Sequence, residues 1–315
     1  MFSKSAHFLS DFPRGKKCWF TVAATSARIR AVQQRFGDPF TLRRAVRPRN
    51  QCFWVRFLYT TRPSQENNNN KVITVDADIG SSIERAHYAL IPAHDFLFTP
   101  AMQESIEAFR LDWEHLEADP YMADGGNYRF RRYGLFRLSA TTGELSAIAG
   151  ASFYQSAKIN PLNGGQPRHF APLTADIASN AFLREVILFD FAQLTANKHI
   201  DDDWLIGVHQ IRILAADGIP GNPTPEGTHR DDENFTAQHL IGRHNISGGI
   251  NYFYGNGPAP TECPQVVWEQ QVYFDSYYFD RSLWHSVSRI VLGDGDGDGY
   301  RDVLLIDFVE SSKLN

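Results

Sequence analysis

The sequence has few cysteines and no long hydrophobic run. No stretch of roughly 18 apolar residues occurs, so the sequence predicts no membrane-spanning helix and no membrane partner. The opening residues, MFSKSAHFLSDFPRGKK, contain no apolar core of a secretory signal. The three cysteines, Cys18, Cys52 and Cys263, are widely spaced and form no C-x-x-C pair, which argues against a disulfide framework and a thiolate zinc site. We therefore expect a reducing compartment, the cytoplasm.

Positive charge is not in excess either. The 315 residues include 31 Lys and Arg against 36 Asp and Glu, a net charge of −5, which argues against a dedicated nucleic-acid binder, a class that is basic overall. Residues 1–62 nevertheless hold 13 Lys or Arg and only two acidic residues. This composition is compatible with a mitochondrial transit segment. The aromatic residues in it favour the alternative, a basic arm that packs on the main domain.

A linker separates two parts of the chain. The segment Pro63–Lys71, PSQENNNNK, has no apolar periodicity. We therefore expect a basic N-terminal extension with an accessory strand, residues 1–70, and a main domain, residues 71–315. The aromatic run Cys52–Thr60 is typical of that strand. Because Lys71–Ala77 alternates in a similar way, the two runs predict a hairpin with the Asn residues at its tip.

The main domain combines helices with many short strands. Apolar residues recur at helical spacing over Thr99–Leu116 and Ile177–Thr195. The runs Tyr128–Leu138 and Leu145–Gln155 are extended in character. From Trp204 onward, short β-branched and aromatic runs alternate with Gly, Pro and Asn, which is typical of an antiparallel sandwich or barrel. The sequence thus predicts an α+β fold with a mainly β core and flanking helices.

Two H-x-D triplets and one H-x-E triplet are candidate metal-binding pairs. Residues i and i+2 share a face only in extended backbone. His199–Asp201 follows a predicted helix and runs into an acidic loop, and His115–Glu117 lies on a predicted helix, where i and i+2 point apart. His229–Asp231 follows PTPEG and precedes a strand, so its imidazole and carboxylate can face one metal ion. We rank this pair first.

A facial site for non-haem Fe(II) needs two histidines and one carboxylate. The second histidine has to come from elsewhere in the chain. His285, in RSLWHSVSRI, lies between two predicted strands and can come from a neighbouring strand of the same barrel. His239 and His244 are alternatives, although both follow Asp231 closely in the sequence. The sequence therefore predicts an iron site made of His229, Asp231 and His285.

An arginine near the end of the chain is a candidate anion clamp. A rigid bidentate donor for a carboxylate is better made from Arg than from Lys. Arg301 opens the strand YRDVLLIDF, and alternation places Val303, Leu305 and Asp307 on its face of the strand. Arg289 is the alternative clamp. A surface salt bridge is the alternative role for Arg301.

The order of these elements resembles the iron(II)/2-oxoglutarate dioxygenases, and within them the branch that includes isoleucine dioxygenase and other free amino-acid hydroxylases. The similar segments run in family order over about 190 residues, and together they are much more specific than one H-x-D triplet. They are RFRRYG (Arg129–Gly134), YQS and INPLNGGQPRHFAPL (within Tyr154–Leu173), HQIRI (His209–Ile213), PTPEGTHRD (Pro223–Asp231), RHNISGG (Arg243–Gly249), WHSVS (Trp284–Ser288) and YRDVLLIDF (Tyr300–Phe308).

This resemblance implies a double-stranded β-helix, a cupin-like jelly roll, over about residues 125–310. It implies Fe(II) held by His229, Asp231 and His285, with 2-oxoglutarate on Arg301 and O2 as the oxidant. No catalytic residue beyond the metal ligands is implied. The implied reaction is hydroxylation of a C–H bond of a free, aliphatic L-amino acid, with release of succinate and CO2. Two departures from the family pattern lie near the mouth of the site: Asp232 follows the ligand Asp231, and INYFYG follows RHNISGG.

A free amino acid needs a cation for its carboxylate and an acceptor for its ammonium group. Candidate substrate-binding residues are Arg131, Tyr154, Arg168 and Arg212, with Arg129 as a further cation. The alternatives for these residues are structural, since buried Arg is usually paired and barrel aromatics are usually core. Alternatives for the reaction are desaturation or cyclisation of an amino acid or another small metabolite, and a jelly-roll protein that binds a small molecule without turnover. The oligomeric state stays open.

Overall fold

The computed structural model describes residues 9–11, 17–19, 72–160, 162–260 and 263–314. The chain divides into two compact units, residues 1–70 and 71–315. In the first unit, β1 (Leu9–Asp11) and β2 (Lys17–Trp19) form an antiparallel pair. The predicted strand at Cys52–Thr60 lies outside the described residues, so its pairing stays a prediction. In the second unit, β3 (Ile73–Val75) pairs with β5 (Phe96–Phe98).

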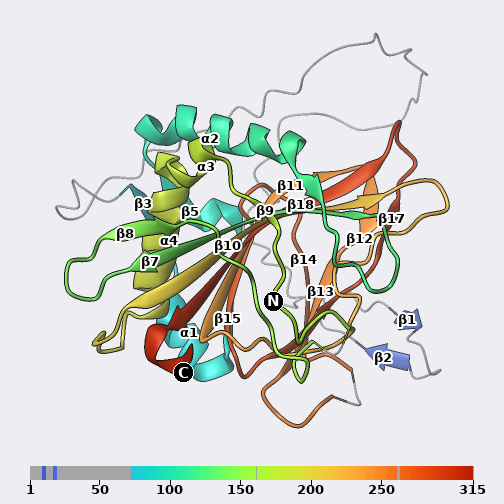
Figure 1. Cartoon of the computed structure of the whole chain (residues 1–315). Coiled ribbons are helices and arrows are strands. Elements are labelled where there is room, and N and C mark those ends of the chain that lie inside the picture. The colour runs from blue at the N-terminus through green and yellow to red at the C-terminus, as the bar shows by residue number, and fades with distance from the viewer. Residues whose placement is uncertain (1–8, 12–16, 20–71, 161, 261–262, 315) are drawn as a thin grey trace, which may run out of the picture. The chain divides into compact units, whose positions relative to one another are not determined.

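A large sheet forms the centre of the second unit (Figure 1). Its neighbouring strands are antiparallel except for β9, which runs parallel to β7. The strand order is β4 (Tyr88–Ile91), β15 (Ser276–Asp280), β11 (Phe235–His244), β18 (Gly299–Glu310), β10 (Trp204–Ala215), β7 (Arg129–Leu138) and β6 (Glu117–Ala118), with β8 (Leu145–Ile148) and β9 (Ala171–Pro172) also on β7.

Shorter antiparallel strands form a second layer. They are β14 (Val266–Glu269), β13 (Ile250–Gly255) and β16 (Trp284–Val287) in one sheet, and β12 (Ile246–Gly248) with β17 (Ile290–Leu292) in another. Single bridges add His229 to His285 and Gly221 to Ile290. The segment that connects β10 to β11 therefore runs along this second layer. The predicted α+β class with a mainly β core is confirmed.

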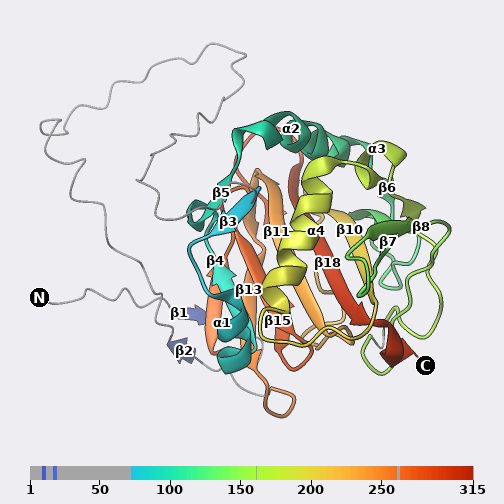
Figure 2. The same cartoon turned by 90° about the vertical axis from the view of Figure 1, so that its left-hand side faces the viewer.

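Helices cover the face of the large sheet that is turned away from the second layer. The helices are α1 (Ile79–Ala86), α2 (Gln103–Leu111), α3 (Ala175–Ala178) and α4 (Ala181–Leu194), with short 3-10 turns η2 (Ala93–Asp95), η3 (Pro100–Met102), η4 (Asp112–His115) and η5 (Ser311–Leu314). The two predicted helical regions thus exist: α2 continues into 3-10 turns at both ends, and a turn separates α3 from α4. Figure 2 shows α4 lying over β10, β11 and β18. None of the described helices is both long and apolar enough to cross a membrane.

Strand β18 shows how alternation divides the two faces of the sheet. Leu304, Ile306 and Phe308 are fully buried in the core beneath α4. Arg301, Val303, Leu305 and Asp307 line a cavity on the other face. A strand that is covered on both sides needs apolar residues toward the helices, whereas the cavity face can carry charge. This confirms the division of faces read from YRDVLLIDF.

A buried polar cluster joins α4 to the sheet. The Asp190 carboxylate accepts hydrogen bonds from His239 Nε2 at 2.9 Å and from the Tyr278 hydroxyl at 2.9 Å. His239 Nδ1 lies 2.7 Å from Ser276 Oγ. All four residues are fully buried. His239 is therefore occupied by a structural contact on the helix side of the sheet, which excludes this alternative metal ligand.

Removing the carboxylate of Asp190 should destabilise the fold strongly. In an Asp190→Ala variant, His239 Nε2 and the Tyr278 hydroxyl lose their buried acceptor, and the free energy of unfolding should fall by about 3 kcal/mol. Urea unfolding followed by circular dichroism measures this change. Asp176→Ala, at an exposed position of α3, should stay within about 0.5 kcal/mol of the parent. Equal stability of the two variants would contradict the structural role of the cluster.

Cys263 differs from the expectation based on cysteine spacing, because it is disulfide-bonded in the structure. The spacing of three cysteines along the chain does not report which sulfurs meet in space. The cytoplasmic location, which was inferred in part from the cysteines, stays a prediction.

Candidate metal centre

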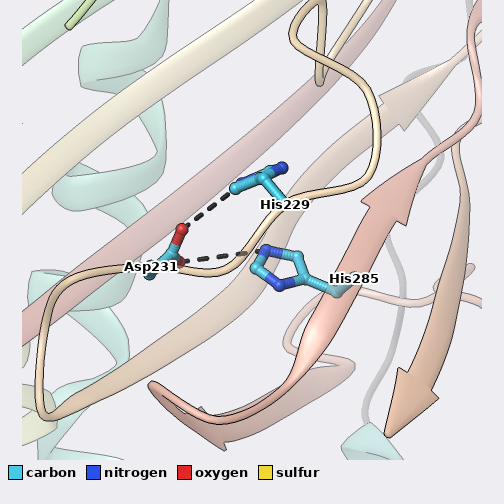
Figure 3. A group of neighbouring side chains, drawn as sticks. All are labelled: His229, Asp231 and His285. Carbon is cyan, nitrogen blue, oxygen red and sulfur yellow. Dashed lines mark ion pairs between the residues drawn. The ribbon is translucent and has the colours of Figure 1, made fainter. Parts of the chain in front are cut away.

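His229, Asp231 and His285 converge at one point (Figure 3). His229 Nε2 lies 3.3 Å from one carboxylate oxygen of Asp231, and His285 Nε2 lies 3.8 Å from the other. One ligand atom from each residue lies within 4.8 Å of the others. Among the described residues, these three are the histidine, cysteine or acidic side chains that lie close enough together to share a metal ion. The structure thus brings together the three residues singled out in the sequence.

Backbone pairing explains why residues 229 and 285 meet. The N–H of His229 donates to the carbonyl of His285 at 3.0 Å, and the N–H of His285 donates to the carbonyl of His229 at 2.9 Å. This two-way bridge places both imidazoles on one side, with ring centres 4.5 Å apart. Each Nδ1 faces a carbonyl oxygen, that of Gly227 at 3.0 Å and that of Leu283 at 3.4 Å. Such contacts fix the ring orientation and leave both Nε2 atoms to face a metal.

The electrostatics of the site favour a bound cation. Burial lowers the pKa of His285 to about 4, so this imidazole is neutral and able to donate a lone pair to a metal. Burial also disfavours the charged form of His229, but Asp231 and Glu226 outweigh it and raise the pKa of His229 to about 9. Burial opposes ionisation of Asp231, yet the two histidines keep its pKa below the ordinary value. Two imidazole nitrogens and one carboxylate, arranged in this way, fit the donor set of non-haem Fe(II).

The other candidate triplets do not form such a site. His199 and Asp201 contact each other at 2.8 Å, but their side chains are 88% and 78% exposed. Glu117 pairs with Arg132 at 3.0 Å. His244 packs against the ring of Tyr300. Of the three triplets, the structure thus places His229–Asp231 beside a third side chain that can bind a metal.

Arg301 lines the cavity and is almost fully buried. It is 1% exposed, and its Nη2 donates to Gln270 Oε1 at 2.7 Å, while its Nε has no hydrogen-bond partner in the described structure. Burial lowers the pKa of Arg301 to about 10, which is a sign that the guanidinium lacks a carboxylate partner. Gly249, with φ of +68°, packs against it: an added Cβ would lie 3.0 Å from Arg301 Cδ. The alternative clamp, Arg289, is exposed and does not line the cavity.

Amide and phenol groups position Arg301. The Tyr277 hydroxyl donates to Gln238 Oε1 at 2.6 Å, and Gln238 Nε2 donates to Gln270 Oε1 at 2.8 Å. Gln270 Nε2 in turn donates to the carbonyl of Asp275 at 2.5 Å. The sequence does not indicate these residues, because they come from separate segments of the chain and no local motif connects them.

Three further arginines line the same cavity. Arg129 pairs with Asp119 at 2.7 Å. Arg131 Nη2 lies 2.5 Å from His209 Nδ1, and its guanidinium stacks on the ring of Phe170. Because Arg only donates, this contact fixes the proton of neutral His209 on Nε2.

Arg168 has no carboxylate partner among the described residues. It is 2% exposed. Its Nη2 donates to Gln155 Oε1 at 3.1 Å, its Nε is unpartnered, and its guanidinium lies 4.7 Å from the ring centre of Phe153. Burial lowers the pKa of Arg168. A buried cation that meets only a neutral amide and an aromatic ring is suited to hold an incoming anion.

Acidic residues also face the cavity. Asp307 lies 2.9 Å from His209 Nε2 and accepts from Thr236 Oγ1 at 3.2 Å. Glu233 is 7% exposed, and burial together with the charge of Asp231 raises its pKa to about 8. Asp307 was visible in the alternation of the last strand, whereas no sequence pattern pointed to Glu233.

Two predicted substrate-binding residues lie elsewhere. Tyr154 is 59% exposed and does not line the cavity, since its neighbour Phe153 takes the inward position. Arg212 forms ion pairs with Asp302 and Glu114, both at 2.8 Å. It alternates with Ile211 and Ile213 on β10, and these two residues, rather than Arg212, face the cavity. The assignment of Tyr154 and Arg212 to the substrate site is corrected accordingly.

The cavity has a volume of about 130 Å³. Besides the metal-binding triad, its lining includes Arg301 with its amide network and a second set of charged residues that contains Arg129, Arg131 and Arg168. The rest of the lining is largely apolar: Gln155, Asn160 and Thr224 are polar, and the other residues are Phe153, Ile211, Ile213, Pro223, Tyr277, Phe279, Val287, Val303 and Leu305. One cavity can thus offer a metal, an anion clamp and a second polar pocket.

Known proteins share both the sequence pattern and the fold. The chain is 26% identical over 247 residues to 3(1)-hydroxy-L-isoleucine 4-dioxygenase of Pantoea ananatis. This alignment covers 75% of this chain and 97% of that protein. It is 26% identical over 201 residues to L-isoleucine-4-hydroxylase of Bacillus thuringiensis, covering 63% of this chain and 80% of that protein.

Solved structures agree with the architecture. The structure of IDO from Bacillus thuringiensis superimposes with a TM-score of 0.63 at 21% identity, over 74% of this chain and 98% of that one. A bsmA homologue from Methylobium petroleophilum gives a TM-score of 0.62 at 25% identity, over 74% of this chain and 92% of that one. These likenesses confirm the predicted double-stranded β-helix, or jelly roll.

The sequence profile described as 2OG-Fe dioxygenase matches residues 110–307, which span the triad, Arg301 and the cavity. This match covers more than half of the chain and runs through each strand that positions the site. The protein is an oxidoreductase whose reaction uses Fe(II), 2-oxoglutarate and O2. The chain belongs to the 2OG-Fe dioxygenase family.

Proposed function

We propose that this oxygenase hydroxylates a C–H bond of a free aliphatic L-amino acid and releases succinate and CO2. The observation that carries the proposal is the presence of two separate arginine sites in one cavity. Arg301 serves the co-substrate, and Arg168 remains for a second carboxylate. The curated relatives are named for oxidation of isoleucine or hydroxy-isoleucine, which supports an amino acid as the second acid.

In this proposal the triad holds the iron. His229 Nε2, His285 Nε2 and the Asp231 carboxylate would hold the Fe(II) ion. Bound Fe(II) and 2-oxoglutarate supply the oxidising power for C–H hydroxylation. The protein contributes orientation and a water-poor pocket. Arg301 binds the far carboxylate of 2-oxoglutarate through guanidinium N–H groups that Gln270 does not use.

Arg168 is positioned to bind the carboxylate of the substrate. Its guanidinium is held between Gln155 and the ring of Phe153, so little ordering entropy is lost when an anion binds. The apolar wall of the cavity, which includes Ile211, Val287 and Leu305, suits an aliphatic side chain. A charged side chain would be desolvated there without a partner.

Replacing Arg168 by leucine should weaken binding of the amino acid selectively. We expect the KM for the amino acid to rise roughly 30-fold or more, because a charge-assisted contact is lost from a buried site, while the KM for 2-oxoglutarate stays the same. The substrate is first found by incubating the protein with Fe(II), 2-oxoglutarate and each standard amino acid, and by mass spectrometry for a product with one added oxygen atom. Arg137→Leu, at an exposed arginine paired with Asp203, is the control. Equal rises in both KM values would contradict the assignment of Arg168.

A further inference from the structure

We propose that Glu233 accepts the α-ammonium group of the substrate, so that Glu233 and Arg168 together bind the zwitterionic end of a free amino acid. This inference rests on the proposed function, and it adds a residue that selects amino acids over other carboxylic acids. Three observations support it: Glu233 lines the cavity, it is buried, and among the described residues it has no ion-pair partner.

The acidic residues that line the cavity are Glu226, Asp231, Glu233 and Asp307. Three of them have partners. Asp231 belongs to the metal-binding triad, Glu226 lies 3.5 Å from the metal-facing Nε2 of His229 and so borders the metal site, and Asp307 contacts His209 and Thr236. Glu233 forms no ion pair in the part of the chain that the structure describes. It is therefore the cavity carboxylate that still needs a cation.

Glu233 is largely shielded from water. Its residue is 7% exposed, and it lies two positions after Asp231, just before β11 begins at Phe235. A cation placed close to a buried carboxyl group stabilises the ionised form of that group. Among the arginines that line the same cavity, Arg129, Arg131 and Arg168 contact Asp119, His209 and Gln155 instead. A cation supplied by the substrate would provide this stabilisation.

Arg168 and Glu233 face the same space without touching. Both line the cavity, and the charge of Glu233, like those of Asp119 and Glu226, acts on Arg168 against the effect of burial. Their side chains nevertheless form no salt bridge. An amino acid carries its ammonium and carboxylate groups on one carbon, so it can bridge an acid and a base that lie near each other but not in contact. An acid that lacks the amine fills only the Arg168 half of this arrangement.

The experiment compares an amino-acid substrate with the matching 2-hydroxy acid, in which a hydroxyl replaces the ammonium group. The wild-type protein should prefer the amino acid in kcat/KM. Glu233→Gln keeps the shape of the side chain and removes its charge, and it should reduce this preference roughly 30-fold, because the charge-assisted contact is lost. Glu233→Asp, which keeps the charge on a shorter side chain, should retain part of the preference. Glu117→Gln, at an exposed strand position outside the cavity, should leave the preference unchanged.

A second readout separates substrate binding from the metal centre. The Fe(II)–2-oxoglutarate complex, formed without O2, has a charge-transfer absorption band that reports the metal and its co-substrate. The band should be retained in Glu233→Gln, because the proposed contact is with the substrate. A shifted or lost band in this variant would assign Glu233 to the metal centre and overturn the inference.

The outcomes distinguish this inference from the proposed function. If the wild type oxidises an amino acid but accepts the 2-hydroxy acid equally well, the role of Glu233 is wrong and the proposed function stands. The same conclusion follows if Glu233→Gln keeps the wild-type preference. If the wild type neither binds nor oxidises any amino acid, both are wrong. The wild-type comparison needs no variant, so it decides the matter even if the Glu233 variants fold poorly.

Discussion

Replacing Asp231 by alanine is expected to lower turnover by more than about 100-fold. Removing a metal ligand should reduce activity more than changing a residue that only supports a ligand through a hydrogen bond. The variant leaves two imidazoles without the carboxylate that lies between them at 3.3 and 3.8 Å. Iron binding should fall with turnover. Succinate formation and bound iron, measured after anaerobic loading with Fe(II), test both effects. His229→Ala should behave in the same way.

A matched control exists within the chain. His199 and Asp201 form the same H-x-D triplet with a contact of 2.8 Å, but both are exposed and no third ligand lies beside them. Asp201→Ala should therefore keep wild-type turnover and iron content. Full turnover in Asp231→Ala, or an equal loss in Asp201→Ala, would show that the triplet at 229–231 is not the metal site.

The second large effect is expected at Arg301. In an Arg301→Ala variant the far carboxylate of 2-oxoglutarate loses its buried guanidinium, and the KM for 2-oxoglutarate should rise on the order of 100-fold or more. The KM for the amino acid should change much less, because Arg168 is retained. Initial rates of succinate formation, measured over a wide range of 2-oxoglutarate concentrations, test this difference.

Arg289→Ala is the comparison for this variant. Arg289 is exposed, whereas Arg301 is 1% exposed and lines the cavity. We expect Arg289→Ala to leave the 2-oxoglutarate dependence as it is. If Arg289→Ala raised this KM and Arg301→Ala did not, the co-substrate would bind at the other arginine.

The sequence predicted those parts of the site that depend on local geometry. Alternation along β18 separates Arg301 and Asp307 from the core residues between them, because successive side chains of a strand face opposite sides. The extended backbone at His229–Asp231 puts i and i+2 on one side for the same reason. His285 was chosen because it lies between two predicted strands, whereas its contact with His229 depends on a long-range backbone bridge.

The remaining features depend on contacts between distant segments. Gln270 reaches Arg301 from 31 positions away, and Glu233 shows its importance only when the other cavity acids are seen to be paired. Tyr154 was misplaced because a shift of one residue in a short strand-like run reverses the side on which a side chain lies. Phe153 therefore faces the cavity and Tyr154 faces solvent.

The most direct test of the central claim is a crystal structure of the protein loaded with Fe(II) and 2-oxoglutarate without O2, with the iron located by its anomalous scattering. The account predicts one iron ion about 2.1 Å from His229 Nε2, His285 Nε2 and an oxygen of Asp231, with the far carboxylate of 2-oxoglutarate on Arg301. An iron ion bound elsewhere, or an imidazole of His285 that does not reach it, would contradict the account.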